Sequence, residues 1–163
     1  MLLLQVGRQK PGAQSDTTEQ DGIAELNRFA KAAGIPGGEL LFDEGSGLSR
    51  SALITPNAIV QLLAFMARHP AGRIFREALP IAGVDGSLRN RIKGTGAEKN
   101  VHAKTGTIGH VHTLSGYLTT AGGEHLVFSL MLNGCHDPGH TAKDDIDPIA
   151  ILLAEFKGRS DTR

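Results

Sequence analysis

The sequence predicts an α+β fold, in which helices in the first half precede an antiparallel sheet and a closing helix. Apolar residues of the first half recur at helical spacing between helix-start and helix-stop residues. Three runs of alternating apolar residues follow at about 101–106, 112–119 and 125–133, and the glycines of Thr120–Glu124 suit a hairpin. Strands joined this closely pair antiparallel, and a last helix ending near Phe156 can cover one face of them.

The composition argues against several classes of function. At 163 residues the chain is one domain, or a large part of one, and is long enough for a core. Its 17 basic and 17 acidic side chains cancel, so no net charge favours nucleic acid or an anionic membrane surface. Six Phe, one Tyr and no Trp offer no platform for stacking single-stranded nucleic acid. Cys135 is the single cysteine, which excludes an internal disulfide framework.

The first residues, Met1 to Leu4, are apolar and carry no helix cap. They are too few to span a membrane and lack the basic start of a signal peptide. We therefore expect residues 1–16 to be the end of a helix whose beginning is missing, followed by a polar loop. Residues 158–163 read as a frayed tail, and residues 1–163 together as the C-terminal part of a single domain.

Start and stop residues place the first complete helix. Asp16 followed by Glu19 has the spacing of a capping box, with Asp in place of the usual Ser or Thr. The apolar periodicity that follows predicts a helix over 17–33, which ends at Gly34.

Similar signals place the other elements. Thr55-Pro56 predicts the start of a helix that ends at Pro70, and a shorter helix follows at about 71–79. Residues 39–42 are a short apolar run that suits a strand. Asp147-Pro148 predicts the first turn of the final helix.

Three consecutive residues of the first long strand carry chemistry. Lys104 supplies a cation, Thr105 a hydroxyl and Gly106 an unhindered backbone, which together suit an anionic, oxygen-rich substrate at a strand edge. The alternative is an ordinary strand that runs into a turn, because this tripeptide also occurs by chance. Strict alternation puts Lys104 and Thr105 on opposite faces, so both can act together only if the strand twists or ends there.

Five segments follow one another in a characteristic order. They are Gly45–Arg50, Thr55-Pro56, Gly83–Arg89, Ala103–Thr107 and Leu114–Tyr117. In this order they resemble the D-alanyl-D-alanine carboxypeptidase/endopeptidase family, the low-molecular-mass class C penicillin-binding proteins of peptidase family S13. The resemblance extends from about residue 20 to 157. It implies a β-lactamase-like transpeptidase fold, of which this chain contributes the later strands and the C-terminal helix.

The resemblance also implies an activity, the hydrolysis of D-alanyl-D-alanine bonds of peptidoglycan stem peptides and cross-links through an acyl-serine, with β-lactams as further ligands. This chemistry needs no metal or organic cofactor. By resemblance Lys104 is catalytic and holds positive charge, Thr105 binds the terminal carboxylate, and Gly106 keeps the strand edge open. The backbone N–H of Thr107 is implied to be an oxyanion-hole donor. A complete family member would be periplasmic, and the location of this chain stays open.

Two motifs of the family are missing from the chain. None of its eight serines has Lys three positions on or Asn two positions on, so Ser-x-x-Lys and Ser-x-Asn are both absent. Glu44 stands where the family often has Asp, and Ser87 where it often has Thr. We therefore expect a portion that is inactive alone and whose partner is the missing N-terminal half of the domain.

Two other functions stay open. One is a non-catalytic interaction fragment that complements a separately encoded N-terminal half. The other is a metal-binding domain, although the spacings of its candidate ligands match no strong zinc pattern. These candidates are His110, His112, Cys135, His136 and His140.

Polar residues of the turns allow one more interpretation. Asp43, Glu44 and Asp85 could act as paired carboxylates, but carboxylates in such turns more often accept bonds from turn amides. Ser46 and Ser49 have no base beside them in sequence and fit the role of turn and cap hydroxyls.

Overall fold

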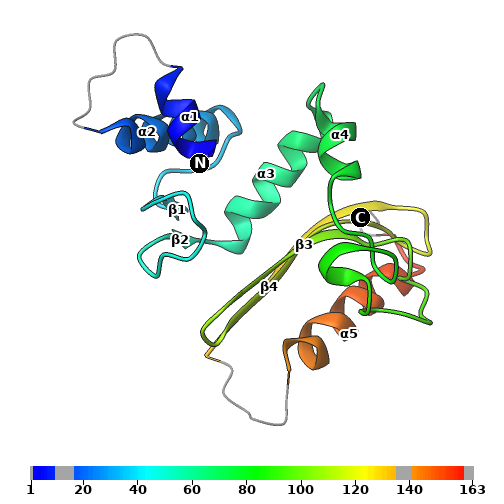
Figure 1. The fold of residues 1–163 in the computed structure, drawn as a ribbon. Coiled ribbons are helices and arrows are strands. Elements are labelled where there is room, and N and C mark those ends of the chain that lie inside the picture. The colour runs from blue at the N-terminus through cyan, green and yellow to red at the C-terminus, as the bar shows by residue number, and fades with distance from the viewer. Residues whose placement is uncertain (1, 10–16, 135–140, 160–163) are drawn as a thin grey trace. The chain divides into compact units, whose positions relative to one another are not determined.

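A computed structural model describes residues 2–9, 17–134 and 141–159 (Figure 1). Contacts divide the chain into two compact units, Met1–Phe65 and Met66–Arg163, which are described separately below. Within the described ranges, no helix has the length and apolar character needed to cross a membrane. The fold is α+β, as the sequence predicts.

The first unit holds α1 (Leu2–Arg8), α2 (Thr18–Ala32) and most of α3 (Pro56–Arg68). Its two short strands, β1 (Leu40–Leu41) and β2 (Leu53–Ile54), pair antiparallel. The helical conformation of Leu2–Arg8 agrees with the interpretation of the first residues as part of a helix. Helices α1 and α2 touch backbone to backbone, because a Cβ at Gly22 would lie 2.5 Å from the Leu3 carbonyl oxygen.

The start of α2 differs from the predicted capping box. Thr17, not Asp16, is the N-cap, and its hydroxyl accepts the backbone N–H of Gln20 at 3.2 Å. Asp16 lies outside the described residues. Aspartate and threonine are both good N-cap residues. The residue just before the first helical residue takes the role, and that residue is Thr17 because α2 begins at Thr18.

The start of α3 is as predicted from Thr55-Pro56. The Thr55 hydroxyl accepts the N–H of Ala58 at 3.0 Å, which caps the first turn. A small core in this unit gathers Ala30, Ala33, Ile35 and Ala58. The rings of Phe29 and Phe65 meet edge to face with centroids 5.8 Å apart.

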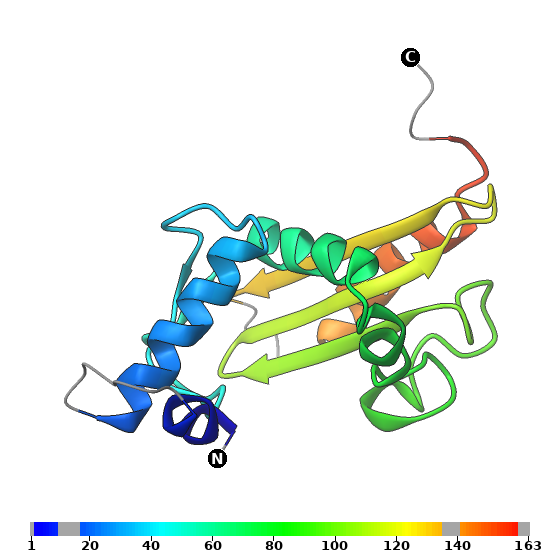
Figure 2. The ribbon, with the colours of Figure 1, turned by 90° about the horizontal axis from the view of Figure 1, so that it is seen from above.

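The second unit is built on a three-stranded antiparallel sheet with the order β3-β4-β5 (Figure 2). Its strands are β3 (His102–Ile108), β4 (Val111–Thr119) and β5 (His125–Asn133), and they confirm the three predicted runs. The predicted hairpin is present, because Thr120 N–H donates to the Glu124 carbonyl at 2.8 Å. Before the sheet come α4 (Gly72–Glu77) and the 3-10 turn η1 (Gly86–Leu88), and after it comes α5 (Ala142–Glu155).

Helix α5 lies along one face of this sheet, as predicted (Figure 1). The strands contribute buried apolar side chains to the interface with α5 and with the loop around η1. They include Ala103, Leu114, Leu118 and Phe128, which meet Ile146, Ala150 and Ala154 of the helix. Because side chains alternate along a strand, the opposite face carries His102, Lys104 and Gly106.

The predicted start of the last helix was wrong. Asp147-Pro148 lies inside α5, which begins one turn and a half earlier, with a capping box formed by Thr141 and Asp144. Asp147 instead forms an ion pair with Arg91, and both side chains are only 11% exposed. That pair, together with the buried face of the helix, outweighs the backbone bond that Pro148 cannot make.

Candidate functional site

The outer edge of β3 is paired at its start and open farther on. Ala82 N–H donates to the Val101 carbonyl and Ala103 N–H donates to the Pro80 carbonyl, both at 2.9 Å. Backbone groups of alternate residues point to the same side of a strand. Those of Thr105 and Thr107 therefore point to the same outer edge, where no described residue of this unit supplies a backbone partner.

Lys104 lies on the sheet face opposite α5. Its cross-strand neighbours on that face are Ser115 and Ser129, whose hydroxyls bond each other at 2.9 Å. The Lys104 Nζ donates to the Thr105 carbonyl at 2.7 Å, and this carbonyl faces the outer edge. The long side chain thus brings its ammonium group from the sheet face to the strand edge.

Thr105 carries its side chain on the other face, as alternation requires, and β3 continues regularly to Ile108. Its Oγ1 donates to the hydroxyl of Ser87 at 2.8 Å, so this group also lies beside the outer edge. The two side chains therefore reach the same strand edge without a break in the strand. They approach the same edge from opposite faces because lysine is long and η1 borders the strand.

Gly106 faces Thr113 across the β3–β4 pair. A Cβ at position 106 would lie 2.5 Å from the Thr113 Oγ1, well inside contact distance. A side chain at position 106 would therefore force Thr113 to rotate or shift, a constraint on the sheet face that the sequence alone does not reveal.

The predicted carboxylates and turn hydroxyls form local bonds. Asp43 accepts from the Ser49 hydroxyl and Glu44 from the Ser46 hydroxyl. Those two serines also accept turn amides at 3.0 Å, as expected of turn hydroxyls. Asp85 accepts the N–H of Ile81 at 2.7 Å. The expectation of turn-amide bonds thus holds for Asp85, whereas the other two carboxylates bond hydroxyls.

The candidate metal ligands are not assembled within the described part of the chain. His110 lies in the β3–β4 turn with φ of 61°, and His112 lies on β4. No group of three or more His, Cys, Asp or Glu side chains there could share an ion. Cys135, His136 and His140 are outside the described residues.

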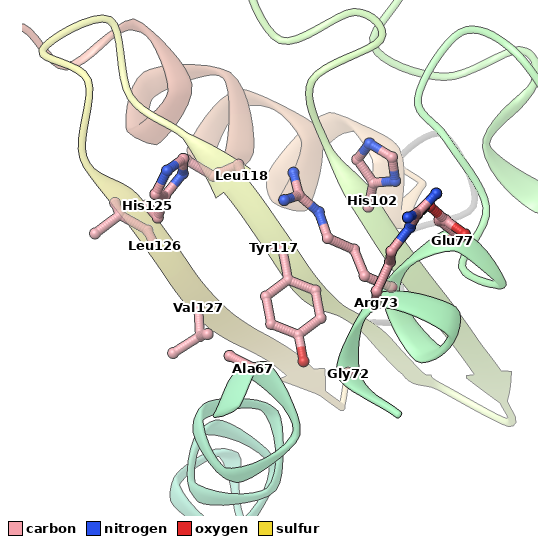
Figure 3. A pocket seen from close by; sticks show the side chains of 11 residues that line it. Ala67, Gly72, Arg73, Glu77, His102, Tyr117, Leu118, His125, Leu126 and Val127 are labelled. Atoms are coloured by element: carbon pink, nitrogen blue, oxygen red, sulfur yellow. Dashed lines mark hydrogen bonds and ion pairs between the residues drawn. The ribbon is translucent and has the colours of Figure 1, made fainter. Parts of the chain in front are cut away.

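A pocket of about 590 Å³ opens on the same sheet face as Lys104, toward the start of β3 (Figure 3). Its walls include His102, Tyr117 and Val127 of the strands and Arg73 and Glu77 of α4. Burial lowers the pKa of His102 and raises the pKa of Tyr117, so both side chains favour their neutral forms. In this pocket, the neutral His102 and Tyr117 side chains therefore offer hydrogen-bonding groups beside Arg73 and Arg76. The sequence signal was weak, namely two arginines three residues apart on a short helix.

Comparison with known proteins places the chain in a family. The sequence model of the D-Ala-D-Ala carboxypeptidase 3 (S13) family matches residues 1–156. The D-alanyl-D-alanine carboxypeptidase of an Actinomadura species is 37% identical over 163 residues, which cover 97% of this chain and 29% of that protein. D-alanyl-D-alanine carboxypeptidase DacB of Haemophilus influenzae is 35% identical over 117 residues, which cover 71% of this chain and 24% of that protein. The chain thus spans less than a third of these relatives.

Solved structures agree with the sequence comparison. Penicillin-binding protein 4 (dacB) of Haemophilus influenzae superposes with a TM-score of 0.68 at 32% identity, over 83% of this chain and 30% of that chain. Its complex with a β-lactam gives 0.72 at 29% identity, over 94% and 35%. A predatory endopeptidase of Bdellovibrio bacteriovorus, in complex with an immunity protein, shares the fold at 22% identity, with a TM-score of 0.59 over 93% and 41%. From the family-model match over residues 1–156, the identity to these relatives and the structural likeness, the chain belongs to the D-Ala-D-Ala carboxypeptidase 3 (S13) family of peptidases.

Proposed function

We propose that this chain forms the substrate-holding wall of a serine D-alanyl-D-alanine carboxypeptidase/endopeptidase that acts on peptidoglycan stem peptides. The observation that carries the proposal is the open edge of β3. There the Lys104 ammonium, the Thr105 hydroxyl and the backbone groups of Thr105 and Thr107 border one stretch of strand. An extended peptide can add to such an edge, with main-chain bonds supplying affinity.

Each residue has a role in this proposal. Lys104 supplies positive charge near the substrate, and Thr105 donates its hydroxyl to the terminal carboxylate. The N–H of Thr107 stabilises the oxyanion that forms during acyl transfer. Gly106 keeps the strand free of a side chain between Thr105 and Thr107. Support comes from the charge and donor types along the edge and from the β-lactam complex of a structurally similar relative.

The nucleophile of the reaction is not among the serines of this chain, because none lies in a Ser-x-x-Lys motif. We propose that a part of the domain outside residues 1–163 supplies it. The whole domain would then be one catalytic unit, of which residues 1–163 form the later portion. Loss of the nucleophile typically leaves only about 10³–10⁴-fold acceleration over water from the remaining groups. The chain alone would therefore bind D-alanyl peptides without efficient turnover.

Two experiments test the proposal. Incubation with a fluorescent penicillin should give no stoichiometric covalent adduct, and such an adduct would contradict the missing nucleophile. Titration with N-acetyl-D-alanyl-D-alanine, followed by NMR, should shift the backbone amides of Thr105 and Thr107 first.

A matched pair of variants sharpens the titration. Thr105→Val removes a hydroxyl with little change of shape and should weaken binding of N-acetyl-D-alanyl-D-alanine about tenfold, in keeping with a lost hydrogen bond to a charged group. Thr119→Val removes a β4 hydroxyl that bonds His125 at 3.0 Å and should leave binding unchanged. Equal losses in both variants, or shifts confined to residues away from the β3 edge, would count against the site.

A further inference from the structure

The loop that precedes β3 is held by bonds before η1 and at the end of η1. The Asp85 carboxylate accepts the N–H of Ile81 at 2.7 Å, and Gly83 N–H donates to the Leu88 carbonyl at 3.0 Å. The Leu88 side chain is fully buried in the core of the second unit. Two bonds and a core anchor therefore fix the path of residues 81–88, although several of their side chains are exposed.

Ser87 lies between the anchored Leu88 and Gly86, whose φ of 51° turns the chain. A Cβ at Gly86 would sit 3.0 Å from the Cγ of Pro80, so the turn packs closely against the segment that pairs with the start of β3. This packing ties Ser87 to the same strand edge that carries Thr105. The Ser87 Oγ accepts from the Thr105 Oγ1 at 2.8 Å.

We infer that Ser87 is a positioning residue, which holds the Thr105 hydroxyl in one rotamer so that it can donate to a substrate carboxylate. The inference rests on the proposed function and adds a residue to that site. Without a partner, a threonine side chain on an open strand edge has more than one accessible rotamer. A bond from a rigid neighbour selects one rotamer before the ligand arrives, which lowers the entropy cost of binding.

The chemistry of two hydroxyls allows this partnership to survive ligand binding. Each hydroxyl has one proton to donate and lone pairs that accept. In the unliganded edge Thr105 donates to Ser87. When Thr105 turns its proton toward a carboxylate, Ser87 can donate its own proton to the Thr105 oxygen. The chain Ser87–Thr105–carboxylate then has every donor used, and each bond polarises the next.

Removal of the Ser87 hydroxyl tests the first step without any ligand. In the wild-type chain, three-bond couplings from the Thr105 methyl carbon to the backbone N and carbonyl carbon should report a single rotamer. Ser87→Ala should give averaged couplings, and Ser87→Thr, which keeps a hydroxyl, should restore the single rotamer. Ser129→Ala serves as a control, since its hydroxyl bonds Ser115 on the other sheet face. A single Thr105 rotamer in Ser87→Ala would overturn the positioning role.

Titration tests the second step. Ser87→Ala should weaken binding of N-acetyl-D-alanyl-D-alanine about fivefold, and Ser87→Thr should bind like the wild type, in keeping with one modest hydrogen bond. Binding of the C-terminal amide of the same dipeptide should be alike in all three chains, because it presents no carboxylate. An equal loss for acid and amide in Ser87→Ala would mean general damage and would contradict the inference.

The two proposals fail in different ways. If the wild-type chain does not distinguish the acid from the amide, the proposed carboxylate site is wrong. The Thr105 couplings in the ligand-free variants still decide whether Ser87 fixes the rotamer. If the wild-type chain prefers the acid but Ser87→Ala keeps that preference and a single rotamer, only the role of Ser87 is wrong.

Discussion

Replacing Gly106 by alanine places a methyl group against the hydroxyl of Thr113, and a double-mutant cycle can measure the resulting strain. The added Cβ would lie 2.5 Å from the Thr113 Oγ1, but 3.7 Å from its Cβ and 4.0 Å from its Cγ2. A single oxygen atom is thus the obstacle. Since rotation of Thr113 can relieve part of the overlap, we expect Gly106→Ala to lower the free energy of unfolding by about 1–2 kcal/mol, within the range for overpacking.

The second variant in the cycle is Thr113→Ala, which removes the obstructing hydroxyl. In the Thr113→Ala background, Gly106→Ala should lower the free energy of unfolding only slightly. The coupling energy between the two positions should therefore be about 1 kcal/mol, with the double variant more stable than the sum of the single changes predicts. Urea unfolding of the four chains supplies the measurement, with equal slopes as the check that the same transition is followed. A coupling energy near zero would refute the packing explanation of Gly106.

The cycle also separates packing from the proposed site. If Gly106 serves only the contact with Thr113, the double variant should regain binding of N-acetyl-D-alanyl-D-alanine together with stability. We expect stability to return and binding to stay weak, because the proposal assigns Gly106 to the strand edge as well. Recovery of both would remove Gly106 from the substrate-binding residues.

Two further predictions concern the second unit. Arg91→Met should destabilise it by about 3–5 kcal/mol in urea unfolding, because it leaves the Asp147 carboxylate buried and unpaired, whereas Arg91→Met with Asp147→Leu should be nearly neutral. An equal loss of stability in the single and the double variant would show that packing of the Arg91 side chain, not the unpaired charge, causes the effect. Burial is the larger cause, and the Arg76 charge the smaller one, of the lowered pKa of His102. Near the usual histidine pKa, the folded chain therefore binds fewer protons than the unfolded chain. Stability should therefore fall as pH drops through 6.5, and His102→Gln should reduce this slope; an unchanged slope would contradict the assignment.

Local signals were enough for most elements. The three alternating runs became β3, β4 and β5, and Thr55-Pro56 became the start of α3, because spacing and capping act over a few residues. Predictions failed where two local signals competed. Asp147-Pro148 resembled a helix start, but Thr141 with Asp144 formed the actual capping box. The short apolar run at 39–42 became β1, whereas β2 has only two residues, too few to show a strand period, and was not predicted.

The Lys104-Thr105-Gly106 strand, the order of motifs around it and membership of the S13 family could be inferred from sequence, because they depend on residue types at fixed spacing. The opposite faces of Lys104 and Thr105 also followed from alternation alone. Only the tertiary structure decided which groups meet at the strand edge. Ser87 and Thr105 are 18 residues apart, and the ion pair of Arg91 with Asp147 spans 56. Contacts of that range depend on how the packed core brings η1 and α5 to the sheet, which no local pattern encodes.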